Sequence, residues 1–193
     1  MAITINGSGT VSGITAGLDA NSMPNGTVLK VFTDTLTSGE SLSLNNGQTD
    51  TSAAWVDSAL DLTCSLARND SNLLILADIK FQSDINAVYR IWDATSSQIV
   101  LGQTGTGGSN QQACSSGGTG ADGPNNGNDY GAHPVPCMVH YNPPSDASSR
   151  QIKIQFLGSN NAGTVYLGRA KGNSNNMYDT YGPCSLTILE IAA

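Results

Sequence analysis

Charge is scarce in this sequence, and positive charge most of all. Charged residues make up 12% of the 193 residues, about half of the quarter that is usual in globular proteins. The chain has 8 Lys and Arg against 15 Asp and Glu, so its formal net charge is −7. The basic residues are few and scattered, so they form no positive stripe that could neutralise phosphate groups. The sequence therefore argues against a nucleic-acid partner.

Long apolar runs are also missing. No run approaches the roughly 18 consecutive apolar residues that a membrane-spanning helix needs, so we expect no membrane partner. The opening MAITINGSGT has neither the basic segment nor the apolar segment of a secretory leader. We therefore expect no signal peptide.

Small polar residues take the place of the missing charge. The chain has 22 Gly, with Ser, Thr and Asn along its whole length. These residues compete for backbone hydrogen bonds or leave the backbone too free, which disfavours long helices. Apolar and polar residues alternate instead, most clearly over 73–81, where Leu73, Ile75 and Ala77 share one face with Ile79 and Phe81,. The sequence predicts an all-β protein.

The alternation predicts about nine or ten short strands, enough for two packed sheets. We expect an antiparallel β-sandwich of the jelly-roll kind. The polar residues 94–97 lie between two apolar runs and predict a β-hairpin,. The predicted strands are 27–37, 41–44, 73–81, 87–93, 98–102, 137–141, 150–157, 163–170 and 185–191.

Two stretches interrupt this rhythm. Residues 1–26 are punctuated by glycine and carry too few apolar groups to form a core. We interpret them as an extended arm that is mobile or orders on a partner, closed by a turn over 23–26. Residues 102–136 are almost free of aliphatic side chains and predict a long loop,. The head domain is then 27–193.

One segment contains the residue types of a metal site. His133, Cys137 and His140 include both histidines of the chain. In a strand over 137–141, however, Cys137 and His140 face opposite ways. Zinc would need a fourth ligand, to which the sequence does not point. We expect a structural role with no metal and no cofactor. Contact of His140 with its own copies at the axis of a symmetric oligomer stays open.

The cysteines allow three disulfide pairings, among which the sequence does not choose. Cys114 lies in the long loop and Cys137 at its far end, so this pair could staple the loop if it is oxidised. Cys64 and Cys184 each lie beside an apolar strand. We interpret them as small, buried hydrophobic side chains.

Catalytic patterns are not found in the sequence. Asp122 and Asp129 offer oxygen ligands for calcium, but their spacing does not match the calcium-binding loop,. A solvated loop is the simpler interpretation. There is no G-x-S-x-G nucleophile elbow, and the acidic residues are scattered rather than paired for glycoside hydrolysis,. We expect no catalytic residues and no enzyme.

Aromatic side chains are few, at 6% of residues. Tyr166 and Trp92, on predicted strands, could face a carbohydrate or lie in the core or in an interface. Tyr178 and Tyr181, in KGNSNNMYDTYG (171–182), are the better candidates for exposed rings.

Several stretches have a familiar form. AITINGSGTVSGI (2–14) matches a short arm of the pattern x-I-x-x-x-G-T-I-T-G-I, and MPNGTVL (23–29) gives the turn and strand that follow such an arm. NLLILADIKF (72–81), GTVYLGRA (163–170) and SLTILEIAA (185–193) supply strands of a head domain. In these stretches the chain resembles virion structural proteins of tailed bacteriophages, especially marine phages and cyanophages. That group includes capsid decorations, head fibres and tail fibres.

The resemblance implies a non-enzymatic, trimeric β-sandwich on the virion, made in the host cytoplasm. Fibre proteins of this sort usually carry a long repetitive shaft, for which this sequence leaves no room between arm and head. We therefore expect a capsid decoration or cement protein whose residues 1–26 dock on the major capsid protein or another virion protein. The alternative is a tail-fibre or short-spike head that binds a host surface glycan.

Overall fold

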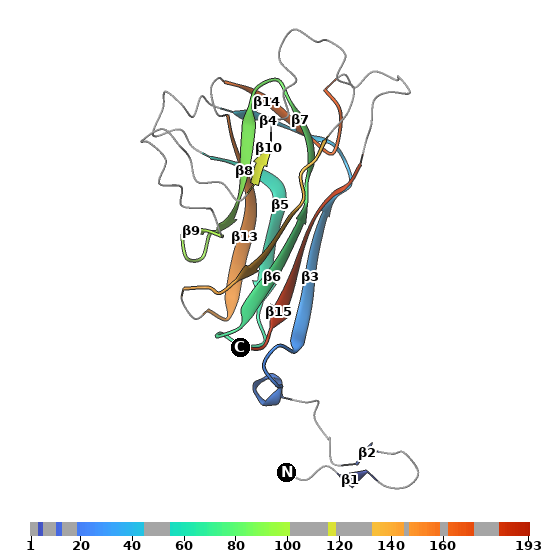
Figure 1. The fold of residues 1–193 in the computed structure, drawn as a ribbon, viewed down its shortest axis with the longest axis vertical. Coiled ribbons are helices and arrows are strands. Elements are labelled where there is room, and N and C mark those ends of the chain that lie inside the picture. The colour runs from blue at the N-terminus through green and yellow to red at the C-terminus, as the bar shows by residue number, and fades with distance from the viewer. Residues whose placement is uncertain are drawn as a thin grey trace.

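The computed structural model of the chain consists of β-strands and turns, with a single turn of 3-10 helix, η1 (Ala20–Ser22), among the residues that it describes (Figure 1). These residues are 4–5, 11–12, 19–44, 55–100, 116–118, 133–144, 147–158, 162–171 and 182–193. Every strand pair in them is antiparallel. The prediction of an all-β protein is confirmed.

Two four-stranded sheets have strand orders that correspond place by place. Sheet I has the order β12 (Cys137–Tyr141), β6 (Asn72–Asp78), β15 (Cys184–Ile191) and β3 (Val28–Leu36). Sheet II has the order β11 (His133–Pro134), β7 (Lys80–Ser83), β14 (Gly163–Leu167) and β4 (Glu40–Leu44). Each strand of sheet II is next in sequence to the strand at the same place in sheet I. Four chain segments therefore pass from one sheet into the other.

The passage between these sheets corrects one predicted strand. The single strand over 73–81 is wrong, because it ends at Asp78 and restarts at Lys80 in a different sheet. Ile79 lies at the break, and its carbonyl accepts a hydrogen bond from Val135 N–H at 2.7 Å. Ile79 is fully buried like its neighbours in the pattern. The apolar alternation continues through the bend and so does not reveal it.

Sheet III has five strands. Its order is β10 (Ser116–Gly118), β8 (Ala87–Asp93), β13 (Ser149–Gly158) and β5 (Val56–Ser65), with β9 (Gln98–Ile99) also paired to β8. The predicted hairpin across 94–97 is confirmed with a shorter second strand, in which Trp92 lies opposite Ile99. β10 and β11 fall inside the predicted loop 102–136, which is therefore not wholly irregular.

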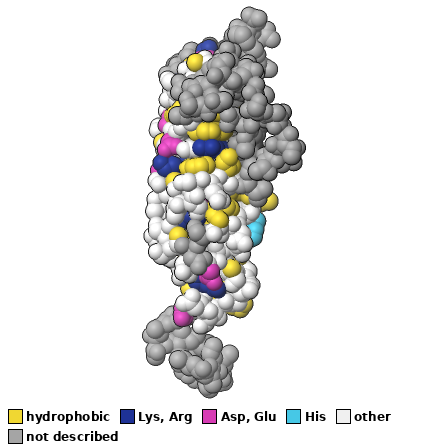
Figure 2. Space-filling view, turned by 90° about the vertical axis from the view of Figure 1, so that its left-hand side faces the viewer, with side chains coloured by type: hydrophobic (Ala, Val, Ile, Leu, Met, Phe, Trp, Pro, Cys, Tyr) yellow, Lys and Arg dark blue, Asp and Glu magenta, His cyan; other side chains and the backbone are white. Residues whose placement is uncertain are grey.

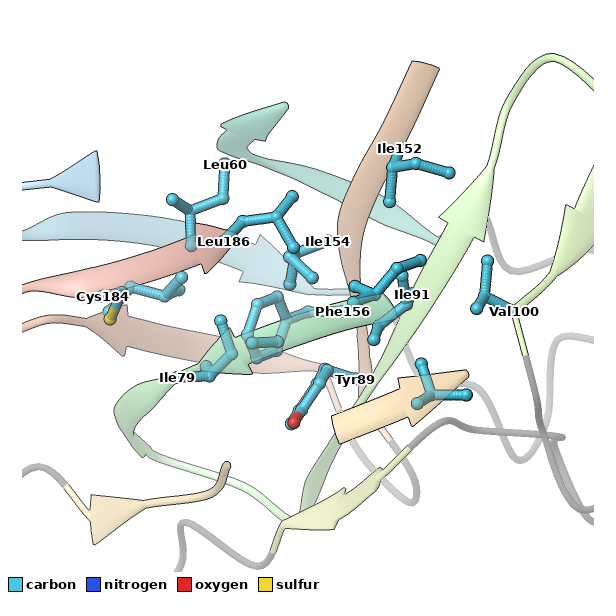
Figure 3. Packing of buried hydrophobic residues seen from close by; sticks show 14 of the residues in the cluster. Leu60, Ile79, Tyr89, Ile91, Val100, Ile152, Ile154, Phe156, Cys184 and Leu186 are labelled. Atoms are coloured by element: carbon cyan, nitrogen blue, oxygen red, sulfur yellow. The ribbon is translucent and has the colours of Figure 1, made fainter. Parts of the chain in front are cut away.

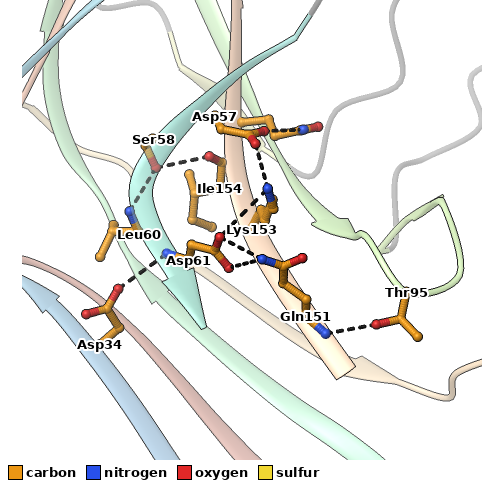
Figure 4. Close-up of polar contacts among 10 residues, drawn as sticks. Asp34, Asp57, Ser58, Leu60, Asp61, Thr95, Gln151, Lys153 and Ile154 are labelled. Carbon is orange, nitrogen blue, oxygen red and sulfur yellow. Dashed lines mark hydrogen bonds and ion pairs between the residues drawn. The ribbon is translucent and has the colours of Figure 1, made fainter. Parts of the chain in front are cut away.

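The longest strand that the sequence did not predict is β5, which forms one edge of sheet III. Its ladder with β13 shifts register between Lys153 and Gln155. At this irregularity the Ser58 hydroxyl donates to the carbonyl of Ile154 at 3.0 Å and accepts from Leu60 N–H at 3.3 Å (Figure 4). A side chain therefore replaces the missing ladder bonds.

One hydrophobic cluster draws on all three sheets (Figure 3). Phe81 of sheet II packs edge-on against Phe156 of sheet III, with ring centroids 5.3 Å apart. Leu186 of sheet I and Leu60 of sheet III belong to the same cluster and are fully buried. Side chains from the three sheets therefore share one core.

Charged side chains cover the free edge of β5. The Glu40 carboxylate accepts from Ala59 N–H at 3.0 and 3.2 Å. Asp34 Oδ2 accepts from Asp61 N–H at 3.3 Å (Figure 4). Asp34 and Glu40 come from β3 and β4, the edge strands of sheets I and II. Charges directed at an exposed edge prevent it from pairing with another chain.

The predicted turn before the head is confirmed in the described part of the arm. Thr27 N–H donates to the Pro24 carbonyl at 3.1 Å, and Gly26 has φ +85°, which glycine adopts without strain,. Gly26 N–H also donates to the carbonyl of Ala192 at 2.8 Å, which ties the turn to the last strand. Further back, β1 (Thr4–Ile5) pairs with β2 (Val11–Ser12). The division at residue 26 stays a prediction.

Candidate functional site

The predicted divergence of the histidine–cysteine segment is confirmed. On β12, Cys137 and Val139 face inward, whereas Met138 and His140 are exposed. Partial burial raises the pKa of the Cys137 thiol. Among the described residues, no group of three or more His, Cys, Asp or Glu side chains lies together as a metal site requires.

Cys64 and Cys184 are fully buried, which confirms their prediction as small hydrophobic side chains. Burial, and then the charge of Glu190, raises the pKa of Cys64 to about 12. Cys184 packs at the bend between sheets I and II, where its Sγ donates to the Lys80 carbonyl at 3.2 Å. Cys114, Asp122, Asp129, Tyr178 and Tyr181 lie outside the described residues, so the predictions that rest on them stay predictions.

A buried ionic network lies on the inner side of sheet III. Asp93 and Arg150 form an ion pair whose side chains are both 0% exposed. Tyr141 Oη donates to Asp93 Oδ2 at 2.8 Å, and Thr95 and Ser96 donate backbone N–H groups to Oδ1 at 3.0 and 3.2 Å. Burial and the Asp93 carboxylate raise the pKa of Tyr141. The two charges are closed to solvent, and the hydrogen bonds from Thr95 and Ser96 to Asp93 fix the β8–β9 turn.

The outer face of sheet III carries a different cluster, built around Arg90. Its guanidinium lies between the rings of Trp55 and Trp92, with Cζ 4.2 and 4.1 Å from the ring centroids. Cross-strand register places Gln155 opposite Arg90 on one side and opposite Asp57 on the other. Arg90 Nε donates to Gln155 Oε1 at 2.7 Å, and Gln155 Nε2 donates to Asp57 Oδ1. We call these five residues the Arg90 cluster.

Next to the Arg90 cluster, ion pairs between β13 and β5 lie on the same face of sheet III. Lys153 Nζ lies 2.7 Å from Asp57 Oδ2 and 3.7 Å from Asp61 Oδ2 (Figure 4). Burial opposes ionisation of Asp57, but hydrogen bonds from Lys153 and Gln155 outweigh it and lower the pKa of this carboxyl. Figure 2 looks onto this side of the molecule, where basic, acidic and hydrophobic groups lie against one another.

Both aromatic strand residues considered in the sequence prove to lie outside the core. Trp92 belongs to the Arg90 cluster and is half-buried. Tyr166 is half-buried on sheet II, where Arg169 Cζ lies 5.0 Å from its ring centroid and its hydroxyl donates to Asp84 at 3.2 Å. Trp55 was not predicted as a site residue, because its role depends on contact with Arg90, which is remote in sequence.

The outer face of sheet I carries several aliphatic side chains among its polar ones. Leu74, Leu189 and Val31 lie in one cross-strand row over β6, β15 and β3, with His140 of β12 at its end. Val31 is 58% exposed and Met138 72%. Antiparallel sheets usually place polar residues on a solvated face. The aliphatic residues that point outward are Val28, Val31, Leu74, Leu76, Met138, Leu189 and Ile191.

A shallow groove crosses this face between β12, β6 and β15. Its lining includes the apolar residues Leu76, Pro136 and Met138 and the polar residues Ser185 and Thr187. We call the face, with this groove, the outer face of sheet I.

No protein-family model matches the chain, and no curated protein is similar to it. Within the described ranges, no helix has the length and apolarity needed to cross a membrane.

Proposed function

We propose that sheets I and II form one layer, and sheet III the other layer, of a jelly roll. The support is the nesting of strand pairs along the chain. β3 and β4 pair with β15 and β14, β5 pairs with β13, β6 and β7 pair with β12 and β11, and β8 pairs with β10. A long antiparallel hairpin that is rolled up gives this nesting. Jelly rolls occur in viral capsid and lectin domains.

We propose further that the protein is a non-enzymatic structural protein of a tailed-phage virion. In this proposal it is a trimeric capsid decoration or cement protein, with residues 1–26 docked on the major capsid protein or another virion protein. The resemblance of the arm and head segments to virion proteins supports this function. The strand order supports a capsid-type domain,.

The observation that carries self-association is the outer face of sheet I. Copies of a chain with net charge −7 repel one another over most of their surface,. On this face Asp78 is the one acidic residue among the described outward positions, and it is paired with Lys80 at 2.5 Å. Like copies therefore meet here on a nearly neutral, apolar surface, as obligate homo-oligomers do. Closed threefold symmetry would bury three such faces.

Cryo-EM of intact virions of the phage that encodes this chain tests the function. Hundreds of copies spread over the capsid are expected for a decoration protein. A few to a few dozen copies at the tail vertex would favour the fibre or spike alternative. Absence of the protein from particles would contradict both.

Deletion of residues 2–22 tests the arm. We expect the truncated protein to remain a folded trimer, by circular dichroism and light scattering, and to lose its attachment to particles. The full chain, added to the same undecorated particles, is the control. Normal decoration by the truncated protein would show that the arm is not the anchor.

The second candidate function is a fibre or spike head that binds a host surface glycan. It is favoured by the position of both tryptophans of the chain, Trp55 and Trp92, on the outer face of sheet III. Flat rings at a surface offer apolar area to the C–H face of a sugar. Binding of the purified protein to host cells, and its loss after removal of their surface polysaccharide, tests this candidate.

A further inference from the structure

The guanidinium of Arg90 is held in place on three sides. Its Cζ lies over the rings of Trp55 and Trp92, and Gln155 accepts the hydrogen bond from Nε. An arginine has five N–H donors in a rigid fork, of which four belong to the terminal nitrogens. These terminal groups make no hydrogen bond or ion pair with any residue that the structure describes. The cluster therefore presents a fixed, unused fork of donors.

The acidic residue nearest in the row does not occupy this fork. Asp57 Oδ1 accepts from Gln155 and Oδ2 pairs with Lys153 at 2.7 Å, so its oxygens have other partners. Asp57 instead fixes the orientation of Gln155, which in turn holds Nε of Arg90. The row of three side chains acts as a support for the arginine.

Burial between the rings also weakens the hydration of this cation. It lowers the pKa of Arg90 to about 10, with the charge of Asp57 acting in the opposite direction. The guanidinium therefore stays charged at neutral pH. A partly desolvated cation with open donors gains more from an anion than a fully hydrated one does.

We infer that the Arg90 cluster binds a saccharide that carries a carboxylate, such as a uronate or a sialate. The planar carboxylate matches the terminal edge of the Arg90 fork, with which it can form two parallel hydrogen bonds. The C–H face of the sugar then lies against the exposed parts of Trp55 and Trp92. A phosphate or sulfate ion lacks an apolar face and would leave the rings unused. This inference rests on the second candidate function, glycan binding.

The two tryptophans provide a direct reporter, since the chain has no others. The purified full chain is titrated with oligosaccharides that contain glucuronate, galacturonate or sialate, and with the same oligosaccharides after reduction of the carboxyl to an alcohol. We expect a change in tryptophan emission with the acidic forms. Their affinity should exceed that of the reduced forms about tenfold or more, because charge-assisted hydrogen bonds are roughly twice as strong as neutral ones. Inorganic phosphate and sulfate are titrated in parallel.

Arg90→Lys keeps the positive charge and removes the fork. It should reduce the preference for the acidic forms severalfold or more, because the bidentate hydrogen bonds are lost, while the melting temperature stays close to that of the wild type. Arg169→Lys is the matched control, because Arg169 also lies over an aromatic ring but its Nη2 already donates to Ser41. This control should bind as the wild type does.

The outcomes separate the inference from the function on which it rests. Equal binding of acidic and reduced sugars, unchanged in Arg90→Lys, would overturn the inference and leave glycan binding in place. Binding of phosphate or sulfate but of no sugar would overturn the saccharide assignment. If no sugar and no host cell is bound, the inference and the second candidate function are both wrong.

Discussion

The two outer faces of this protein differ although they cover the same core. Outward positions of β8 and β13 carry Arg90, Lys153 and Gln155, and those of β6 and β15 carry Leu74, Leu76 and Leu189. Inward positions of all four strands are mostly apolar. Stability of one domain needs only the inner rows, so the apolar residues of the outer face of sheet I call for another explanation. We propose from this difference that sheet I faces another copy of the chain and that sheet III faces water or a small ligand.

The largest expected effect comes from charging the apolar face. Leu76→Asp combined with Leu189→Asp should convert the proposed trimer to monomers, because two carboxylates per copy would be buried unpaired at each interface. Sedimentation velocity measures the assembly, and circular dichroism shows whether the monomer is folded.

The matched control places the same charges on the opposite face. Val88→Asp with Thr63→Asp alters outward positions of β8 and β5 in sheet III. This variant should remain trimeric. A trimer in the Leu76/Leu189 variant, or a monomeric wild-type protein, would contradict the proposed interface.

The second effect contrasts the inner and outer sides of sheet III. Arg150→Met leaves Asp93 buried without its partner, which should lower the free energy of unfolding by about 3–5 kcal/mol. Lys153→Met, on the same strand but in a surface ion pair, should lower it by less than about 1 kcal/mol. Chemical denaturation of both variants measures the difference. Equal losses would mean that the outer ion pairs are as important to stability as the inner one.

The sequence predicted most strands because alternation depends only on neighbours along the chain. β8, β12, β13 and β15 lie close to their predicted bounds. β5 was missed because its inward row includes Ser58 and Cys64 beside Leu60, although polar and apolar residues do alternate in it. The bend at Ile79 could not be predicted from the sequence, since a buried residue continues the apolar alternation across it.

The candidate sites depend on the register between strands that are distant in sequence. The sequence alone does not specify this register. Trp55, Arg90 and Gln155 come from three separate segments and meet only because β5, β13 and β8 pair as they do. The apolar face did leave a signal. The run from Leu73 to Ala77 is apolar at odd and at even positions, so both of its faces are apolar. This pattern is typical of a strand that is covered on both faces,.

A third effect distinguishes the faces by their response to salt. Raising the ionic strength to about 1 M shortens the screening length to about 3 Å and weakens exposed ion pairs. Apolar contact between copies should persist, and screening of the net charge of −7 should favour it,. Sedimentation equilibrium at low and high salt measures the trimer. Dissociation at high salt would indicate that the interface is ionic and lies elsewhere.

The smallest expected effect is the acid response of the support row on sheet III. The pKa of Asp57 is lower in the folded protein than the ordinary value of about 3.9,. Its contribution to stability is therefore complete above the unfolded value and is lost as the pH falls through the folded one. Wild type should thus lose more free energy of unfolding than Asp57→Asn between about pH 6 and pH 2, by a fraction of a kcal/mol since the pair is exposed. Denaturation series followed by tryptophan emission measure this, because both rings lie on the arginine that the row supports. Parallel curves for the two proteins would mean that Asp57 does not stabilise the row, and that Gln155 is held in place by its strand alone.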